Sequence, residues 1–332
     1  MEYMTLADYY QQAPNELVKG IVQQLRYKSI LIDQLNFVTT GTLAVKNVRE
    51  SSEEDPEIPW VEIGEELGSS AVTKPEEVQS RAFTFGTTIK TDHLLVEDKT
   101  PKLYDPRKRD TEIKVDIMIR QFSDVLINNT VAANPKAPVG LKSFIDTYLP
   151  TQKRIAKEST GLDLDPTGVN YAANNMLFWR LLDYGKEMVD GGATHILCND
   201  QFIRCAKALQ RESGMLTTTK DALGRDITSY DGMRFIDVGR KSKKTGARII
   251  TDYEDASGVP GTSVDSTHCY TSIYFVRMDP GHFQPWQFAP LSAKDEGRLP
   301  GSKFYQTTIE WTIGYMITDQ MSIARIYGLK ME

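Results

Sequence analysis

The stretch from residue 51 to residue 66 restricts the fold of this chain more than any other part of the sequence. It holds seven acidic residues and no lysine or arginine, and Pro56 and Pro59 interrupt it. Like charges at this density repel one another and keep a segment extended, and proline lacks a backbone hydrogen-bond donor. The stretch is therefore a poor candidate for a layer of a packed core, and we expect it to lie in a long excursion from the folded body.

Residues typical of β-strands flank this acidic stretch on both sides. Residues 37–50 are rich in such types, and apolar and polar side chains alternate over residues 81–96. We predict that residues 50–95 as a whole form a two-stranded ribbon. Because a two-stranded ribbon has little stability on its own, it needs a surface to lie against, and another subunit is the natural candidate.

Helical periodicity is strongest over residues 105–130, where Pro106 stands near the start. At a rise of 1.5 Å per residue, this helix would be roughly 35–40 Å long, which is above the average for globular proteins. Its expected apolar face consists of Ile113, Val115, Ile117, Ile119, Phe122, Val125 and Leu126.

Shorter elements are expected on both sides of this helix. We expect residues 1–36 to form an extended or partly helical arm. The spacing of apolar residues over 169–189 predicts a helix, which Gly191-Gly192 would end. Asn199 offers an N-cap for a further helix over residues 201–212. The apolar face of helix 169–189 is expected to hold Ala173, Leu177, Leu181, Tyr184 and Met188. Strands are expected at residues 194–198, 248–251, 271–276 and 304–326, with turns between short strands over 223–238.

Charge and apolar patterns argue against two classes of partner. The formal net charge is −6 and the pI is about 5.5, so the basic footprint of a dedicated nucleic-acid binder is missing. No segment approaches the ~18 consecutive apolar residues that favour a membrane helix, so no membrane partner is expected. The three cysteines form no paired framework, which is typical of a reducing compartment.

No motif for catalysis, a cofactor or a metal stands out. The four histidines lie far apart, and the acids of residues 252–265 lack the periodicity of a calcium loop. Neither a G-x-G-x-x-G nor a G-K-[ST] phosphate loop occurs, and Gly261-Thr262-Ser263 is not part of a G-x-S-x-G elbow. We therefore expect no catalytic residues, no cofactor and no metal.

The order of elements resembles the Hong Kong 97 fold, which major capsid proteins of tailed bacteriophages share with bacterial encapsulins. The resemblance covers most of the chain, and short strings in a fixed order carry it. In the first half these strings are Trp60–Glu65, Thr91–Asp98 and Val139–Leu141. In the second half they are Thr194–Asp200, Lys220–Arg225, Tyr230–Met233, Ile236-Asp237, Tyr315–Ile317 and Ala324–Tyr327.

The resemblance implies an α+β fold and a structural role without catalysis. Its parts would be an N-terminal arm (1–49), an extended loop (50–97), a peripheral domain with a long spine helix (98–168), an axial domain (169–290) and return strands of the peripheral domain (291–332). The chain would self-assemble into hexamers and pentamers of an icosahedral shell around double-stranded DNA. The implied location is the virion capsid, assembled in the host cytoplasm.

The same resemblance implies a set of partners. These are other copies of the chain, a separate scaffolding protein, a portal, and DNA held by weak non-specific contact, with a decoration protein as a further option. Some members of the family join subunits by a Lys–Asn bond. Lys74 lies in the loop, but no motif identifies its partner, so a cross-link is not expected.

Two groups of charged residues and one aromatic residue are expected at contacts between subunits. The acidic group consists of Glu53, Glu54, Asp55, Glu62, Glu65 and Glu66. It would dock on basic residues of a neighbour, and the basic group consists of Arg81, Arg107, Lys108, Arg109, Arg240, Lys241, Lys243 and Lys244. Trp60 would enter a pocket between subunits. The simpler alternatives are a solvated loop tip for the acids and a core position for Trp60.

Three other interpretations stay open. An encapsulin has the same fold, although encapsulins tend to be shorter and the long acidic ribbon favours a phage. A metabolic enzyme of α+β fold predicts a compact body with a deep polar pocket, whereas a capsid subunit predicts a flat body that the ribbon and the arm leave. A tail or adhesion component would show β repeats, and the sequence has none.

Overall fold

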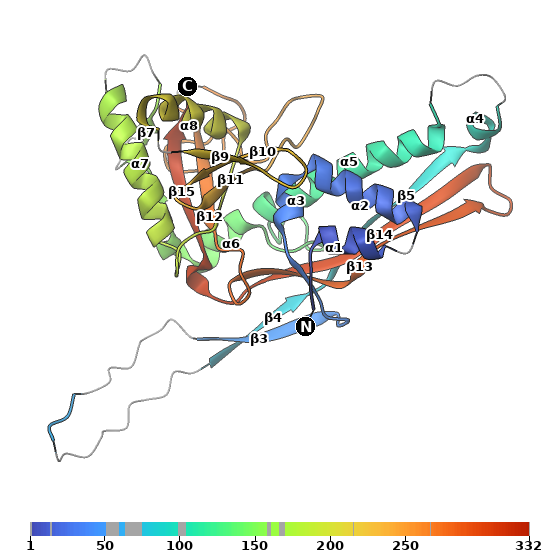
Figure 1. Ribbon diagram of the computed structural model, residues 1–332, viewed down its shortest axis with the longest axis horizontal. Coiled ribbons are helices and arrows are strands. Elements are labelled where there is room, and N and C mark those ends of the chain that lie inside the picture. Colours follow the sequence, from blue (N-terminus) through green and yellow to red (C-terminus); the bar gives the residue numbers. More distant parts are fainter. Residues whose placement is uncertain are drawn as a thin grey trace.

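The computed structural model describes residues 2–13, 15–50, 60–63, 75–98, 104–157, 161–165, 170–214, 216–265 and 267–331. Within these residues, the strands form a five-stranded sheet, an eight-stranded sheet and a two-stranded ribbon. Figure 1 shows that the two sheets occupy different parts of an elongated molecule and that the ribbon leaves the body. The fold is α+β, as the sequence predicts.

The five-stranded sheet is built on one long hairpin. Its centre is the antiparallel pair β13 (Phe283–Arg298) and β14 (Phe304–Ile317). The order of strands in the sheet is β1-β2-β13-β14-β5. The strands outside the hairpin are β1 (Glu2–Met4), β2 (Phe37–Thr39) and β5 (Phe83–Asp92). Buried side chains of this sheet share a core with the N-terminal helices and with helix α5 (Pro106–Asn128).

The N-terminal segment packs on the body, so the expectation that an arm at residues 1–36 leaves the body is wrong. It forms three helices, α1 (Leu6–Gln12), α2 (Glu16–Lys28) and α3 (Ile30–Gln34). The apolar side chains of α2 recur at helical spacing and are buried against the sheet. Burial of this stripe outweighs the freedom that an arm would keep.

The long helix is confirmed, with its start at Pro106. The Asp105 side chain caps it by accepting a hydrogen bond from the Arg107 backbone N–H at 2.9 Å. Its buried face differs from the predicted stripe, since Ile113 is exposed and Met118 is buried. The helix contacts both α2 and β5, and these partners, which are distant in sequence, determine which of its side chains are buried.

The eight-stranded sheet is the centre of the other part of the molecule. Its path is β6-β15-β12-β8-β11-β10-β9, and β7 pairs with β15. Strand β12 (Tyr270–Val276) is apolar on both faces, because Tyr274 and Val276 enter the core with α2 and α5 while Ile273 and Phe275 enter the core of α7 and α8. The other strands are β6 (Lys153–Ile155), β7 (Leu162–Asp163), β8 (His195–Cys198), β9 (Thr217–Lys220), β10 (Asp226–Tyr230), β11 (Met233–Asp237) and β15 (Ile323–Lys330).

Two helices of this part lie where the sequence predicts them. They are α7 (Tyr171–Glu187) and α8 (Asp200–Ser213), and the Asn199 side chain caps α8 by accepting from the Phe202 N–H at 2.8 Å. The predicted apolar face of α7 is wrong for Ala173, Leu177 and Tyr184, which are exposed. The helix instead approaches the sheet through Gly185, where a Cβ atom would lie 2.2 Å from the Phe275 ring. This contact rotates the buried face by about one residue.

One other strand prediction is wrong. The isolated bridge from Arg240 to Arg248 is the only β-structure over residues 248–251. A tight turn, closed by a hydrogen bond from the Gly246 N–H to the Ser242 carbonyl at 3.0 Å, connects the two sides of this bridge. Strand β15 lies in the eight-stranded sheet beside β12, although residues 291–332 were expected as return strands of the peripheral domain. Its apolar residues on both faces require a fully covered sheet.

The ribbon is shorter than predicted. Strands β3 (Ala44–Glu50) and β4 (Pro75–Arg81) pair over seven residues each. The returning segment that was expected in the ribbon, β5, instead pairs with β14 in the body over ten residues. Because β5 alternates in burial and its second half holds the buried Ile89 and Thr91, it gains more contact from the sheet than from a free ribbon.

The remaining helical elements are short. They are α4 (His93–Glu97), α6 (Leu141–Tyr148), η1 (Pro150–Gln152) and η2 (Gln320–Ser322). Among the described residues, no helix combines the length and the apolar character needed to cross a bilayer.

Candidate assembly surfaces

The base of the ribbon is fastened to the body by hydrogen bonds. The Ser80 hydroxyl donates to the Tyr315 carbonyl at 2.7 Å and accepts from the Trp286 indole N–H at 3.1 Å. On the other strand, the Asn47 side-chain amide donates to the Thr318 hydroxyl at 3.1 Å. Trp286 itself is buried. The ribbon therefore leaves the body in a defined direction, which Figure 1 shows.

Two large apolar side chains are exposed at residues 60–63, beyond the described strands of the ribbon. Residues 60–63 lie away from the body in Figure 1. Trp60 is 101% exposed and Ile63 is 109% exposed, and Glu62 between them is exposed too. The core interpretation of Trp60 is therefore wrong within the subunit.

Two neighbouring hollows lie where β4 and β5 meet the loop at residues 131–138. We call them the paired hollows, and they measure about 470 and 430 Å³. Phe83, Ala137 and Pro138 line both of them. The rest of the wall is largely apolar and includes Val78, Tyr148 and Met316 in the first hollow and Phe85, Phe122 and Val125 in the second.

The basic residues near the loop at 240–248 already have partners in their own chain. Arg240 pairs with Asp200 at 2.8 Å and Lys241 with Asp124 at 2.8 Å, while Lys243 pairs with Asp116. Lys244 is exposed. Lys241 and Lys243 bind carboxylates of the long helix, so this cluster joins the loop to α5.

The basic residues at the start of α5 are also engaged in part. Arg107 pairs with Asp295 at 2.5 Å, and the Arg109 guanidinium lies 4.4 Å from the centre of the Tyr104 ring. Lys108 and Arg81 are exposed. The predicted contact residues Glu53, Glu54, Asp55, Glu65 and Glu66 lie outside the described residues, as does Lys74.

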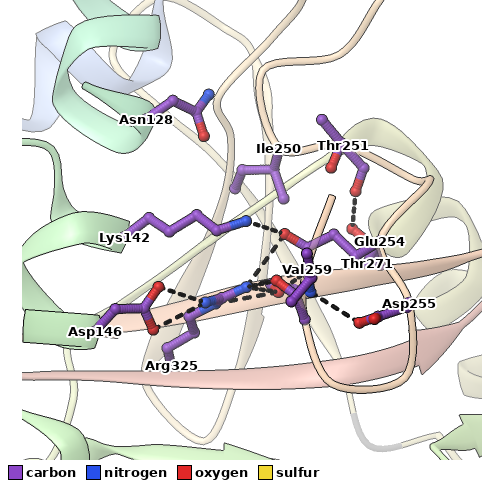
Figure 2. Close-up of polar contacts among 12 residues, drawn as sticks. Asn128, Lys142, Asp146, Ile250, Thr251, Glu254, Asp255, Val259, Thr271 and Arg325 are labelled. Carbon is purple, nitrogen blue, oxygen red and sulfur yellow. Dashed lines mark hydrogen bonds and ion pairs between the residues drawn. The ribbon is translucent and has the colours of Figure 1, made fainter. Parts of the chain in front are cut away.

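A buried ion network, which the sequence analysis missed, surrounds Arg325 of β15 (Figure 2). The Arg325 side chain is 0% exposed and donates to Glu254 at 3.2 and 3.3 Å and to Asp146 at 3.2 and 3.3 Å. Lys142 donates to Glu254 at 2.6 Å. The Ser272 hydroxyl and the Gly258 carbonyl complete the shell of Arg325. A charge inside the apolar run Ile323–Ile326 was the sequence signal for this site.

This network connects helix α6 to the eight-stranded sheet. Figure 2 shows Lys142 and Asp146 projecting from one helix toward Glu254 and Arg325. Burial lowers the pKa of Lys142, although the Glu254 carboxylate opposes that shift. Because nearly every donor and acceptor of the cluster is bound within it, its groups suit a structural joint between the two parts of the molecule.

A second ionic joint connects the N-terminal helices to the same part. The Asp221 carboxylate accepts from the backbone N–H groups of Leu223 and Arg225 at 2.9 Å each and closes the turn that the sequence analysis singled out. Arg225 then donates to Asp33 and to the Arg26 carbonyl, at 2.6 Å each. The Asp-x-x-Gly-Arg turn therefore positions an arginine that binds α2 and α3.

Metal-binding and reactive groups are sparse in the described part of the chain. No group of three or more His, Cys, Asp or Glu side chains there could hold a metal ion. Burial raises the pKa of the Cys198 thiol well above its ordinary value, so this thiol is a weak nucleophile.

Comparisons with known proteins agree on the fold. No protein-family model matches the chain, and no curated protein matches its sequence. The structure is similar to the SrpI encapsulin of Synechococcus elongatus PCC 7942, with a TM-score of 0.53 and 11% identity over 91% of this chain and 87% of that chain. It is also similar to the capsid of a native GTA particle, with a TM-score of 0.52 and 13% identity over 88% and 87%.

A third similar structure comes from Microbacterium phage Oxtober96, with a TM-score of 0.52 and 9% identity over 91% of each chain. Identities this low show the fold alone. The chain has a Hong Kong 97-like fold, and the prediction from the sequence is confirmed.

Proposed function

We propose that this chain is the major capsid protein of a tailed bacteriophage, a subunit that assembles into hexamers and pentamers of an icosahedral shell around double-stranded DNA. One observation carries the proposal. A Hong Kong 97-like body sends out a fastened ribbon, and Trp60 and Ile63, which lie in the chain between its two strands, are completely exposed. A subunit that stayed alone would leave this apolar surface in water.

The interior of the described structure supports a structural role without catalysis. Its most deeply buried charges, on Arg325 and Glu254, are bound to each other and to neighbouring groups. A catalytic site would instead leave a reactive group open to a substrate. The two ionic joints hold the two parts of the subunit in one arrangement, which a regular shell requires of each copy.

The proposed partners follow from the shell. The subunits bind one another, and the acidic run with Glu53, Glu54 and Asp55 docks on basic residues of a neighbour, where complementary charge sets the register of assembly. Lys244, Lys108 and Arg81 are exposed and best placed to receive it. A separate scaffolding protein, a portal and a decoration protein complete the particle, and the packaged DNA makes weak non-specific contacts. Assembly takes place in the host cytoplasm.

A second candidate is an encapsulin-type shell that encloses proteins. The similarity to the SrpI encapsulin, over 91% of this chain, favours it. The two candidates differ in contents. Particles purified from cells of the natural source would contain nuclease-protected DNA if the phage proposal holds, and a co-purifying protein without DNA if the encapsulin alternative holds.

The first test is negative-stain electron microscopy of the protein expressed alone and together with a scaffolding protein, with size-exclusion chromatography beside it. Closed particles, sheets or tubes of regular capsomers are the expected result. A compact monomer that forms no capsomers even with the scaffold would overturn the shell proposal and favour an enzyme.

A further inference from the structure

The paired hollows form an apolar site that the proposed shell function does not require. We propose that they bind a long-chain fatty acid. Its carboxylate lies beside Arg81 and Tyr315 in the first hollow, and its acyl chain runs past Phe83 and Pro138 into the second. This inference goes beyond the shell function, because it assigns a small-molecule ligand to the single subunit.

The two hollows have the size and the walls of a ligand site. Their volumes of about 470 and 430 Å³ both fall within the range of about 300–1,000 Å³ that is usual for small-molecule sites. Phe83, Ala137 and Pro138 line both hollows, so one elongated molecule can contact both of them. In the second hollow, Phe122 and Leu126 of the long helix add further apolar wall. Such a wall stabilises a bound acyl chain by removing it from water.

Positive charge lies at the edge of both hollows. Arg81 lines the first hollow and Lys136 the second; both are exposed, and neither takes part in an ion pair in the part of the chain that the structure describes. The two acids of the lining, Glu77 and Asp124, are each paired with a lysine, at 2.5 and 2.8 Å. An anionic head group would therefore meet a cation that no acid of the lining neutralises.

An unpaired hydroxyl favours the first hollow as the place of the head group. Tyr315 lines this hollow, and its hydroxyl is buried without a hydrogen-bond partner among the described residues. A buried donor without an acceptor is unfavourable, and a carboxylate beside it would accept its hydrogen bond. The Arg81 guanidinium can bind the same carboxylate through two N–H groups. Together the two side chains favour an anion over a neutral molecule with the same chain.

Isothermal titration calorimetry of unassembled subunits tests the acyl-chain site. This state is the suitable one, because Arg81 is also proposed to receive the acidic run of a neighbour. From octanoate through decanoate to laurate, the affinity should rise about fourfold for each added methylene. An affinity that does not depend on chain length would overturn the proposal. Subunits that self-associate as their concentration rises and bind no laurate would show that a second copy fills the hollows, and would overturn it as well.

Two substitutions test the position of the head group. Arg81→Met should weaken laurate binding about tenfold and leave the binding of 1-dodecanol, which has the same chain and no charge, unchanged. Lys136→Met removes a charge at the second hollow and should change laurate binding little. Equal losses for the two variants would show attraction at a distance and overturn the assignment to Arg81.

Tyr315→Phe separates a binding role from a structural one. It should weaken laurate binding severalfold, while the empty subunit should unfold at the temperature of the parent or above it, because the hydroxyl has no partner to lose there. Unchanged laurate binding would overturn the placement of the carboxylate beside Tyr315.

A bulky side chain in the shared wall tests whether the ligand occupies the hollows at all. Ala137→Trp fills space in both hollows and should abolish laurate binding. The matched control is Ala132→Trp, which adds an indole at an exposed position of the same loop outside the lining of either hollow, and it should bind like the parent. Full laurate binding by Ala137→Trp, or equal losses for both variants, would overturn the proposal.

Discussion

Arg325 illustrates how a single residue can hold two parts of this molecule together. Its guanidinium is fully buried, and its partners come from α6, from β12 and from the loop that contains Glu254. Moving such a charge out of water is unfavourable, so each bond of the cluster offsets part of that cost. Removing the guanidinium leaves the buried Glu254 carboxylate with Lys142 as its remaining cation.

We therefore expect Arg325→Met to lower the free energy of unfolding by about 3–5 kcal/mol. The matched control is Lys330→Met on the same strand, where Lys330 pairs with Asp163 at 2.6 Å near the surface. Exposed pairs contribute about 0–1 kcal/mol. Urea denaturation of unassembled subunits measures both changes, and equal losses for the two variants would argue against a special role for Arg325.

His195 makes stability depend on pH. Burial, together with a smaller contribution from the nearby Arg234, lowers its pKa to about 4, while Asp279 opposes the shift. Its Nε2 atom is buried without a hydrogen-bond partner in the described chain. The unfolded chain, with a histidine pKa near 6.5, binds the proton more readily than the folded chain between these two values.

Above pH 6.5 His195 is neutral in both the folded and the unfolded chain, so the free energy of unfolding is at its full value. It falls as the pH falls toward 4, because the unfolded chain takes up the proton first. The loss amounts to about 3 kcal/mol, at about 1.4 kcal/mol per pKa unit. Unfolding free energies measured from pH 7.5 to pH 4 should fall less steeply for His195→Gln than for the parent. Parallel curves would show that His195 does not titrate in this range.

At the scale of elements, two glycines inside helices have opposite roles. Gly185 of α7 lets the helix touch the sheet, since a Cβ atom there would lie 2.2 Å from the buried Phe275 ring. Gly20 of α2 has open space at the same position. Glycine disfavours a helix relative to alanine by about 0.5–1 kcal/mol when nothing else intervenes.

Gly20→Ala should therefore stabilise the subunit by about 0.5–1 kcal/mol. Gly185→Ala should destabilise it by about 1–3 kcal/mol, because a well-packed core resists an added carbon. Denaturation of the two single variants under one set of conditions compares them directly. Stabilisation by both substitutions would mean that α7 can move away from the sheet at little cost.

At the scale of the whole molecule, charge is distributed unevenly. The acidic run at residues 51–66 holds seven of the 45 acidic residues of the chain, while exposed basic residues lie on the body. If the acids dock on a neighbour, Glu53→Lys/Glu54→Lys/Asp55→Lys should impair particle formation at low salt, where charges act over about 30 Å. The defect should shrink near 1 M salt, where that range is about 3 Å.

A control variant with three acidic residues changed to lysine elsewhere on the chain has the same net charge as the ribbon variant. Glu16, Glu187 and Asp226 are exposed on the body, and their change to lysine should affect assembly less. Light scattering across a salt series measures both variants. Normal assembly of the ribbon variant at low salt would remove the docking hypothesis and leave the acids as a solvated loop.

The sequence by itself determined several of the elements and where some of them begin. Pro106 and Asn199 mark helix starts that the structure confirms, because caps and periodicity are local properties of the chain. The order of short strings along the chain also sufficed to identify a resemblance to the Hong Kong 97 fold, which the structure confirms.

Only the tertiary structure decided which elements meet. Strand β5 pairs with β14 and leaves the ribbon, the N-terminal helices pack on the body, and Gly185 rotates the buried face of α7. Arg325 and Glu254 lie 71 residues apart and form one cluster. Each of these outcomes depends on surfaces that are distant in sequence and compete for the same partner, and local patterns of charge and hydrophobicity do not rank such competitors.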